Sequence, residues 1–354
     1  MKSKGFFLII MIILISSCSK NKIESDIYTV KGLIYKPVCI TFKSEKVGYA
    51  FCNGDKSPYP TEAQLANPNY NAPITFTAYV YKTSDGGNSW SQVNVLNNYS
   101  FYPTILSYKN KIFIKLIDRR KELRSYLVEY NENDNKIIFL NYTFERMGDV
   151  WFAKNRVFID GNKENINKIV STDENLEIVD STNVDNIVFM NEVCNFNNHC
   201  FVLTWANKLY DITNKKTINL SENKYSQINK VNNEEMLLFS NKKEHNKVVI
   251  IEKYNIKTLK RRKIKELKDY SIISEFKSND SVIAGFVGNI VGVFTEYDLL
   301  YSLDKGETWE TYHLNDPNYY TPNCLIGNIM YLINGDKIIQ KIRFGNTPNL
   351  SIVN

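Results

Sequence analysis

An eight-residue pattern that occurs twice constrains the fold of this chain more than any other feature. Residues 83–90 and 302–309 both read [ST]-x-D-x-G-x-[ST]-W. Each copy follows an apolar, tyrosine-bearing run and precedes another extended stretch, which is typical of a β-hairpin turn. In such a turn the Asp accepts hydrogen bonds from turn amides, the Gly supplies a positive φ, and the Trp buries a large apolar surface. The residues with these roles are Asp85, Gly87, Trp90, Asp304, Gly306 and Trp309.

Weaker forms of the same turn recur along the chain. Residues 130–136, 210–216 and 254–260 all read Y-[DN]-x4-K, and residues 171–175 keep a Ser and an Asp of the first pattern. The six turns follow one another at steps of roughly 40 to 48 residues, which is the length of a four-stranded propeller blade. Each unit between them offers about four short strands in which apolar and polar residues alternate. The sequence therefore predicts an all-β fold, a β-propeller of four-stranded blades.

The strands can be grouped into units along the whole chain. Six units have four strands each and cover residues 37–98, 101–141, 142–180, 185–220, 224–266 and 270–315. The remaining piece, 319–345, has only three strands, and an N-terminal strand at 27–35 can supply the fourth. We therefore expect seven blades closed by the N-terminal strand, with six or eight as the alternatives. Residues 27–345 would form one domain, followed by a C-terminal tail at 346–354.

Two families share parts of these patterns. The repeated turn resembles the Asp-box (BNR repeat) of sialidase-like β-propellers, where the motif is structural. Residues 40–42 (ITF), 47–50 (VGYA) and the turn that ends at Trp90 resemble photosystem II stability/assembly factor-like propellers. This second resemblance covers the first unit well, the sixth partly, and the middle units only in their period. It implies a scaffold that binds protein, without a catalytic role.

The N-terminus indicates export. Residues 1–17 have a basic start, an apolar run at 6–15 and small residues before a cleavage point, as in a secretory signal peptide. The run is shorter than the roughly 20 residues that a transmembrane helix needs. Its Ile-Ser-Ser-Cys end resembles a bacterial lipobox, which would make Cys18 the lipidated first residue of the mature chain. An ordinary cleaved signal is the alternative. Residues 18–26 would then be a lipidated tether, and Ser19 resembles lipoproteins sent to the outer membrane.

Charge and composition exclude several function classes. The formal net charge is +6, and it falls to +4 once the signal peptide and its two lysines are removed. So small a charge argues against nucleic-acid binding. The three histidines fall in separate turns without metal-ligand spacing, and no G-x-S-x-G, P-loop or C-x-x-C pattern occurs. We therefore expect no metal and no cofactor.

Five cysteines remain after Cys18, an odd number for an exported protein. Cys194 and Cys200 flank five residues, so a tight hairpin could place them opposite each other as a disulfide. Cys39 and Cys52 could face each other in the same way. Buried, unpaired strand cysteines are the alternative in both cases.

Ligand-binding residues of a propeller usually lie on the face opposite to the Asp-box turns. On that face we expect a loop at 53–73, and a loop of about 20 residues is usually functional or disordered. Packing decoration is the alternative for this loop. Arginines in the second unit and after it add cationic groups for an anionic partner, although a generally Lys-rich surface would look similar. The candidate ligand-binding residues are Tyr59, Tyr70, Arg119, Arg120 and Arg146.

Together these patterns favour a monomeric, non-enzymatic binding scaffold. It would be lipid-anchored in the bacterial cell envelope and would bind a protein or a surface glycan as its partner. It would contact the membrane only through its lipid. A divergent sialidase-like, glycan-active enzyme is one alternative. The eight arginines of the mature chain do not fit the arginine triad of that family, and its Arg-Ile-Pro pattern is absent, so no catalytic residue is assigned. A toxin-neutralising lipoprotein is another alternative.

Overall fold

The computed structural model describes the chain as strands joined by turns. The described residues are 23–55, 76–108, 111–119, 124–144, 146–153, 156–163, 166–172, 177–183, 190–196, 200–204, 207–220, 223–241, 247–291, 294–314, 321–333 and 338–345. In these ranges every assigned element is a strand, and no helix is long and apolar enough to cross a membrane. The predicted all-β class is confirmed.

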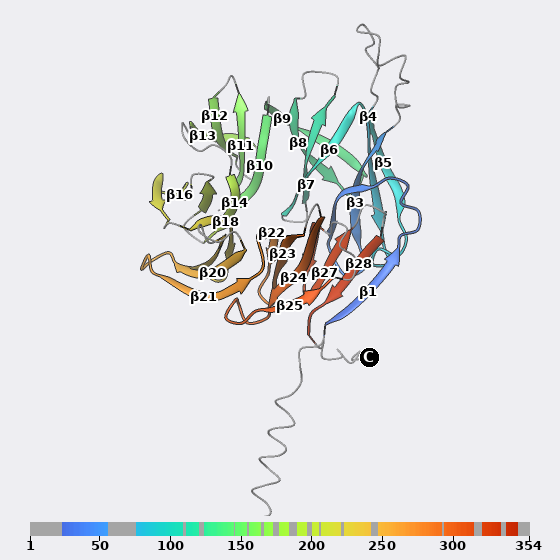
Figure 1. Cartoon of the computed structure of the whole chain (residues 1–354). Helices are drawn as coiled ribbons and strands as arrows, with labels where there is room; N and C mark the ends of the chain where they lie inside the picture. The colour runs from blue at the N-terminus through green and yellow to red at the C-terminus, as the bar shows by residue number, and fades with distance from the viewer. Residues whose placement is uncertain are drawn as a thin grey trace, which may run out of the picture.

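The strands form seven four-stranded antiparallel sheets, here called blades, in the described part of the chain (Figure 1). Blade 1 is β2 (Pro37–Phe42), β3 (Gly48–Asp55), β4 (Phe76–Thr83) and β5 (Ser91–Asn97). Blade 2 is β6 (Tyr99–Tyr108), β7 (Lys111–Asp118), β8 (Ser125–Asn131) and β9 (Lys136–Phe144). Blade 3 is β10 (Arg146–Ala153), β11 (Arg156–Lys163), β12 (Ile166–Thr172) and β13 (Ile178–Asn183).

The remaining blades follow in the same strand order. Blade 4 is β14 (Met190–Asn195), β15 (Cys200–Thr204), β16 (Lys208–Asp211) and β17 (Lys216–Asn219). Blade 5 is β18 (Lys224–Lys230), β19 (Glu235–Asn241), β20 (Val248–Asn255) and β21 (Arg261–Lys268). Blade 6 is β22 (Ile272–Ser278), β23 (Ile283–Val291), β24 (Phe294–Ser302) and β25 (Glu310–His313). Blade 7 is β26 (Thr321–Ile326), β27 (Ile329–Ile333), β28 (Ile338–Arg343) and β1 (Glu24–Thr29).

Both ends of the chain contribute to blade 7. β1 pairs with β28 over six residues, from Glu24 opposite Arg343 to Thr29 opposite Ile338. The first strands of the blades, β2, β6, β10, β14, β18, β22 and β26, contact one another in this order, and β26 contacts β2. The blades therefore form a ring. We call the end where first strands turn into second strands, and third into fourth, the turn end, and the opposite end the connection end.

The closing strand is shorter than the sequence predicted. A strand was expected at 27–35, but β1 ends at Thr29 and the chain then turns away from blade 7. Lys31 donates its N–H to the carbonyl oxygen of Asn88 (3.1 Å) and accepts from the N–H of Trp90 (2.9 Å). Gly32 has a φ of +79°, which does not fit an extended strand. These contacts with blade 1 end the strand early.

Every first strand carries an irregularity that the sequence did not predict. In all seven blades the pairing of the first and second strands shifts register on the first strand. In blade 2 the shift falls between Phe101 and Ile105. Because bulges bend a strand and increase its twist, these shifts curve the strands that contact one another around the ring.

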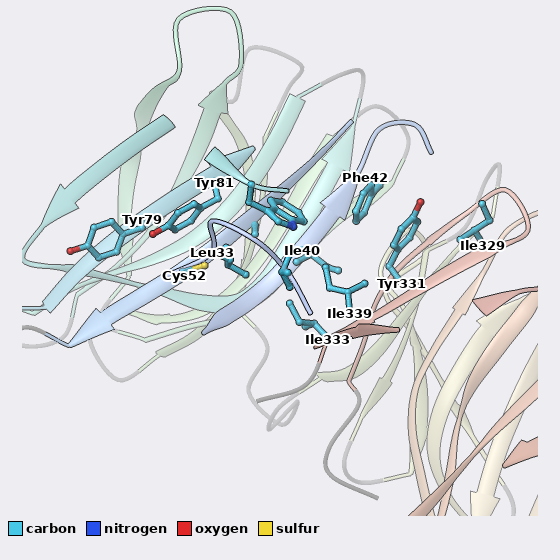
Figure 2. Packing of buried hydrophobic residues seen from close by; sticks show 13 residues of the cluster. Leu33, Ile40, Phe42, Cys52, Tyr79, Tyr81, Ile329, Tyr331, Ile333 and Ile339 are labelled. Atoms are coloured by element: carbon cyan, nitrogen blue, oxygen red, sulfur yellow. The ribbon is translucent and has the colours of Figure 1, made fainter. Parts of the chain in front are cut away.

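The core lies between neighbouring blades, since successive side chains of a strand point to opposite faces. In β19, Met236 and Leu238 pack with blade 4, whereas Leu237 and Phe239 pack with blade 6. All four side chains are fully buried. The ring is closed by a similar layer between blades 7 and 1, where Phe42 and Tyr331 stack face to face (Figure 2).

Candidate binding face

The two tryptophan turns, residues 83–90 and 302–309, have the same internal hydrogen bonds. Asp85 accepts from the N–H of Ser89 (3.0 Å) and from the hydroxyls of Thr83 (2.8 Å) and Ser89 (2.5 Å). The Trp90 indole N–H donates to the carbonyl oxygen of Gly87 (2.8 Å), which has a φ of +97°. In the second turn Asp304, Gly306 and Trp309 make the equivalent bonds. These bonds hold the turn as a rigid unit over its tryptophan.

Each tryptophan is buried between two blades. Trp90 meets the ring of Phe42 edge-on at 6.1 Å, and Phe42 stacks on Tyr331 of blade 7 at 3.8 Å. Trp309 meets Phe276 edge-on at 6.0 Å, and Phe276 stacks on Phe239 of blade 5 at 4.1 Å. The same three-ring arrangement thus joins blade 1 to blade 7 and blade 6 to blade 5. Both turns therefore have a structural role.

Charged groups further stabilise the tryptophan turns and their contacts with neighbouring blades. Hydrogen bonds from Ser89 lower the pKa of Asp85 to about 2. Glu307, in the second tryptophan turn, forms ion pairs with Lys253 and Arg262 of blade 5. The bond from Lys253 lowers the pKa of Glu307. These ion pairs join blades 5 and 6 at the turn end.

The candidate ligand-binding residues lie mostly outside the described residues. Tyr59, Tyr70 and Arg120 are outside them, and of Arg146 only the backbone, at the start of β10, is described. Arg119 is described and exposed at the connection end of blade 2. Of the predicted 53–73 loop only residues 53–55 are described, as the last residues of β3, and the next described residue is Phe76, where β4 begins.

Arg119 connects this loop region of blade 1 to blade 2. Its guanidinium carbon lies 4.5 Å from the ring centre of Phe76, the first residue of β4. Its Nε donates a hydrogen bond to the hydroxyl of Ser100 (2.8 Å). The guanidinium therefore lies over an aromatic ring, and Arg119 as a whole remains exposed.

A second cation–aromatic pair lies nearby on blade 2. Tyr102 falls in the irregular part of β6, and its side chain is 45% exposed. The ammonium of Lys115, a residue that is 6% exposed, lies 4.1 Å from the Tyr102 ring centre. An exposed ring with a buried cation behind it can stack against an apolar or aromatic group of a partner. Sequence analysis missed this pair because the exposure of Tyr102 depends on the bulge.

Sequence analysis also missed a set of asparagines at the connection end. The Asn53 amide donates to the carbonyl oxygen of Phe101 (2.9 Å) and accepts from its N–H (2.7 Å), so blade 1 holds the first strand of blade 2. Asn207 makes the equivalent pair of bonds to the start of β18 (2.6 and 2.9 Å). Asn241 donates to the backbone just before β22 (2.9 Å). These side chains bind backbone groups of the next blade.

The sequence does contain a signal for these asparagines. An Asn or Asp stands at or close to the end of the second strand in each blade: Asn53, Asp118, Asn162, Asn207, Asn241, Asn289 and Asn334. From Asp118 onward these residues recur at steps of 34 to 48 residues, whereas the first step, from Asn53, is 65 residues long.

A third polar cluster lies on blade 6. Asp298 accepts a hydrogen bond from the Tyr270 hydroxyl (2.5 Å), and Nδ1 of the exposed His313 lies 2.8 Å from its other oxygen. Burial and the Asp298 carboxylate raise the pKa of Tyr270. Tyr270 lies just before β22, so this cluster fixes the connection between blades 5 and 6. Among the described residues no group of three or more His, Cys, Asp or Glu could hold a metal ion.

The observed register corrects the predicted Cys194–Cys200 disulfide. Cys194 pairs with Phe201, and Cys200 pairs with Asn195. Cross-strand partners share a face and successive residues alternate, so the two positions lie on opposite faces of blade 4. Cys39 and Cys52 are separated in the same way, because Cys39 packs toward blade 2 and Cys52 toward blade 7. Burial raises the pKa of Cys39 to about 12.

Comparisons with known proteins agree with this architecture. No family model and no curated protein matches the sequence. Among solved structures, one titled "YCF48 bound to D1 peptide" matches with a TM-score of 0.56 and 10% identity, over 93% of this chain and 98% of that one. A chain of the mitotic checkpoint complex matches with a TM-score of 0.57 and 9% identity, over 91% of both chains.

A third solved structure is the β-propeller domain of the trilobed protease from Pyrococcus furiosus. It has a TM-score of 0.56 and 8% identity, over 84% of this chain and 91% of that one. At such identities the likeness concerns the fold alone. Together with the four-stranded sheets, the comparisons show that the chain folds as a β-propeller.

Proposed function

We propose that this protein is a cell-envelope lipoprotein, anchored through Cys18, whose propeller is a non-enzymatic scaffold that binds a protein segment. The observation that carries the proposal is the pair of cation–aromatic contacts in the half of blade 2 toward the connection end. Arg119 lies on Phe76, and Lys115 lies behind the exposed ring of Tyr102. Arginine and tyrosine are enriched among the residues that dominate protein–protein binding energy.

The division of contacts between the two ends supports this choice of face. At the turn end, the tryptophan turns and their ion pairs join neighbouring blades. At the connection end, the asparagine amides hold the backbone while Tyr102 and Arg119 remain exposed. A rigid backbone that presents exposed aromatic and cationic groups loses little conformational entropy on binding. The likeness in fold to a structure that holds a peptide also favours a peptide-like partner.

We further propose that the tryptophan turns are Asp-boxes, as in BNR-type propellers, and that they serve stability. Their hydrogen bonds and the burial of both indoles favour this assignment. A surface glycan is a second class of partner for the same aromatic residues, and the outer membrane is the proposed location. The predicted monomer and the absence of catalysis belong to the same proposal.

The test is capture of a partner from envelope extract by the propeller without its lipid, residues 19–354. We expect one protein to bind wild type and to bind the Tyr102→Ala/Arg119→Ala variant at least about tenfold more weakly, as expected when two central contacts are lost. A matched control is Leu259→Ala/Lys305→Ala, which alters exposed residues on the hairpin turns of blades 5 and 6. Equal binding by both variants would refute the assignment of the binding site to Tyr102 and Arg119. Binding of a glycan without any protein would refute the proposal that the partner is a protein.

The anchor is tested separately. A Cys18→Ser variant of the full chain should lose lipid labelling and leave the membrane fraction. If the Cys18→Ser variant is lipid-labelled to the same extent as wild type, lipidation at Cys18 is refuted. This result would leave the proposed binding site untouched.

A further inference from the structure

The outer strand of blade 5 differs in charge from the other outer strands. β21 carries five basic residues, Arg261, Arg262, Lys263, Lys265 and Lys268, and all five are exposed. The outer strands β1, β5, β9, β13, β17 and β25 carry at most one Lys or Arg each. Isolated lysines on an edge strand prevent edge-to-edge pairing, and they would be needed on every blade. Protection of the edge therefore does not explain why the charge is concentrated on blade 5.

The charge of this hairpin accounts for the charge of the protein. Residues 247–269, the third and fourth strands of blade 5 with their turn, contain nine Lys or Arg and three Asp or Glu, a formal charge of +6. The whole chain has the same net charge, +6. Without the two lysines of the signal peptide, the residues outside this hairpin carry a formal charge of −2. The surface of blade 5 is thus a local positive patch on a chain that otherwise has little net charge.

Several residues of this patch have partners within the protein: Lys257 pairs with Glu234 (2.6 Å) and Lys263 with Glu266 (2.9 Å). Arg261 donates to the hydroxyl of Tyr225 (2.9 Å), and Arg262 pairs with Glu307 (3.1 Å). Lys260 and Lys265 are exposed, and within the described part of the chain neither makes an ion pair. We call residues Lys257, Lys260, Arg261, Arg262, Lys263, Lys265 and Lys268 the basic rim.

We infer that the basic rim binds an anionic lipid surface and so orients the propeller on its membrane. This inference rests on the proposed lipid anchor. Between Cys18 and Glu24, where β1 begins, the chain spans at most about 22 Å even when fully extended, which keeps the propeller close to the bilayer. Two further lysines, Lys20 and Lys22, lie in this short segment.

The position of the rim fits the same geometry. Glu24 pairs with Arg343 at the turn end of blade 7, and Lys257 and Lys260 lie in the hairpin turn of blade 5, which is also at the turn end. From this turn the rim follows β21 along the outer edge of blade 5 to Lys268, opposite Val248 at the connection end. In Figure 1, β21 and the N-terminal end of β1 both lie on the lower side of the molecule. Lipid headgroups are therefore the anionic surface that this end of an anchored propeller meets first.

The experiment uses the protein without lipid, residues 19–354, and vesicles of phosphatidylcholine with or without about 30% phosphatidylglycerol. We expect sedimentation with the anionic vesicles only, and release at about 0.5 M salt because screening shortens the range of the attraction. Lys260→Glu/Lys265→Glu should lower the partition coefficient by at least about 30-fold, since each lost lysine contributes about 1 kcal/mol near an anionic surface and each new glutamate is repelled by it.

The matched control is Lys136→Glu/Lys216→Glu, which changes two exposed lysines in the hairpins of blades 2 and 4. Lys136 and Lys216 occupy the same position of the Y-[DN]-x4-K turn as Lys260. This control should bind anionic vesicles like wild type. The inference is overturned if both variants lose binding equally or if wild type does not bind anionic vesicles. It is also overturned if wild type binds polyglutamate but not anionic vesicles. Because the protein is not lipidated here, these results are independent of the Cys18→Ser test.

Discussion

Replacing Trp309 with alanine tests whether the tryptophan turns join neighbouring blades. Trp309 is 6% exposed and contacts Phe239 and Phe276 edge-on at 5.7 and 6.0 Å. Truncating a buried tryptophan to alanine costs about 3–5 kcal/mol, and each lost aromatic pair contributes about 0.5–1.5 kcal/mol beyond its area. We therefore expect Trp309→Ala to fall in the upper part of this range. Trp90→Ala should behave alike, because Trp90 has the same environment at the interface of blades 7 and 1.

The assay is thermal unfolding followed by circular dichroism. A propeller of about 320 residues has an unfolding entropy of about 0.7 kcal/mol/K near its Tm, so a loss of 3–5 kcal/mol lowers the Tm by roughly 4–8 °C. Tyr102→Ala is the control, because it removes an aromatic ring that is 45% exposed. A Tm within 1 °C or so of wild type for both tryptophan variants would refute the reasoning. So would an equal loss in the Tyr102 control.

Four further changes test other parts of the ring. Deleting residues 19–35 removes β1 and its pairing with β28, so the Tm should fall even though the other strands are intact. Asp85→Asn should lower the Tm at pH 6, and the difference should shrink as the pH falls from 5 to 2, because the lowered pKa of Asp85 stabilises the fold only above that range. Gly32→Ala should destabilise more than Gly345→Ala, since both glycines have a positive φ but only at Gly32 would a Cβ meet a backbone oxygen, at 2.2 Å. Asn53→Ala should cost about 1–3 kcal/mol in urea unfolding, because backbone groups of the next blade lose their partner.

The sequence was most informative where a turn requires particular residues. Five of the six predicted turns are described in full, and each joins the third and fourth strands of a blade. In the Y-[DN]-x4-K turns the side chain at the second position accepts hydrogen bonds from turn amides, as Asp211 does from Thr213 (3.0 Å). Such bonds are local, so a few residues specify them. The remaining predicted turn, at 171–175, lies partly outside the described residues.

Features that depend on two distant segments were not accessible in this way. The end of β1 at Thr29 results from the contact of Lys31 with residues almost 60 positions later. The exposure of Tyr102 follows from a register shift against β7. The hairpin that suggested a Cys194–Cys200 pair exists, but its register is offset by one residue, and one residue changes the face of a strand. The sequence predicted Arg119 at the candidate binding site but not the Tyr102–Lys115 contact, because that contact depends on the pairing of two strands.

The two ends of the propeller would have different surroundings in an anchored protein. Arg343, opposite Glu24 in blade 7, forms an ion pair with Glu45 (3.4 Å), and the neighbouring Lys46 accepts from the N–H of Gly86 in the first tryptophan turn (2.9 Å). The point where the chain leaves for Cys18 and the tryptophan turn of blade 1 are therefore at the same end. A lipid at Cys18 would hold this end, with Lys257 and Lys260 of the basic rim, next to the membrane. The connection end, with Arg119 and Tyr102, would then face away from the bilayer, where a protein partner can reach it.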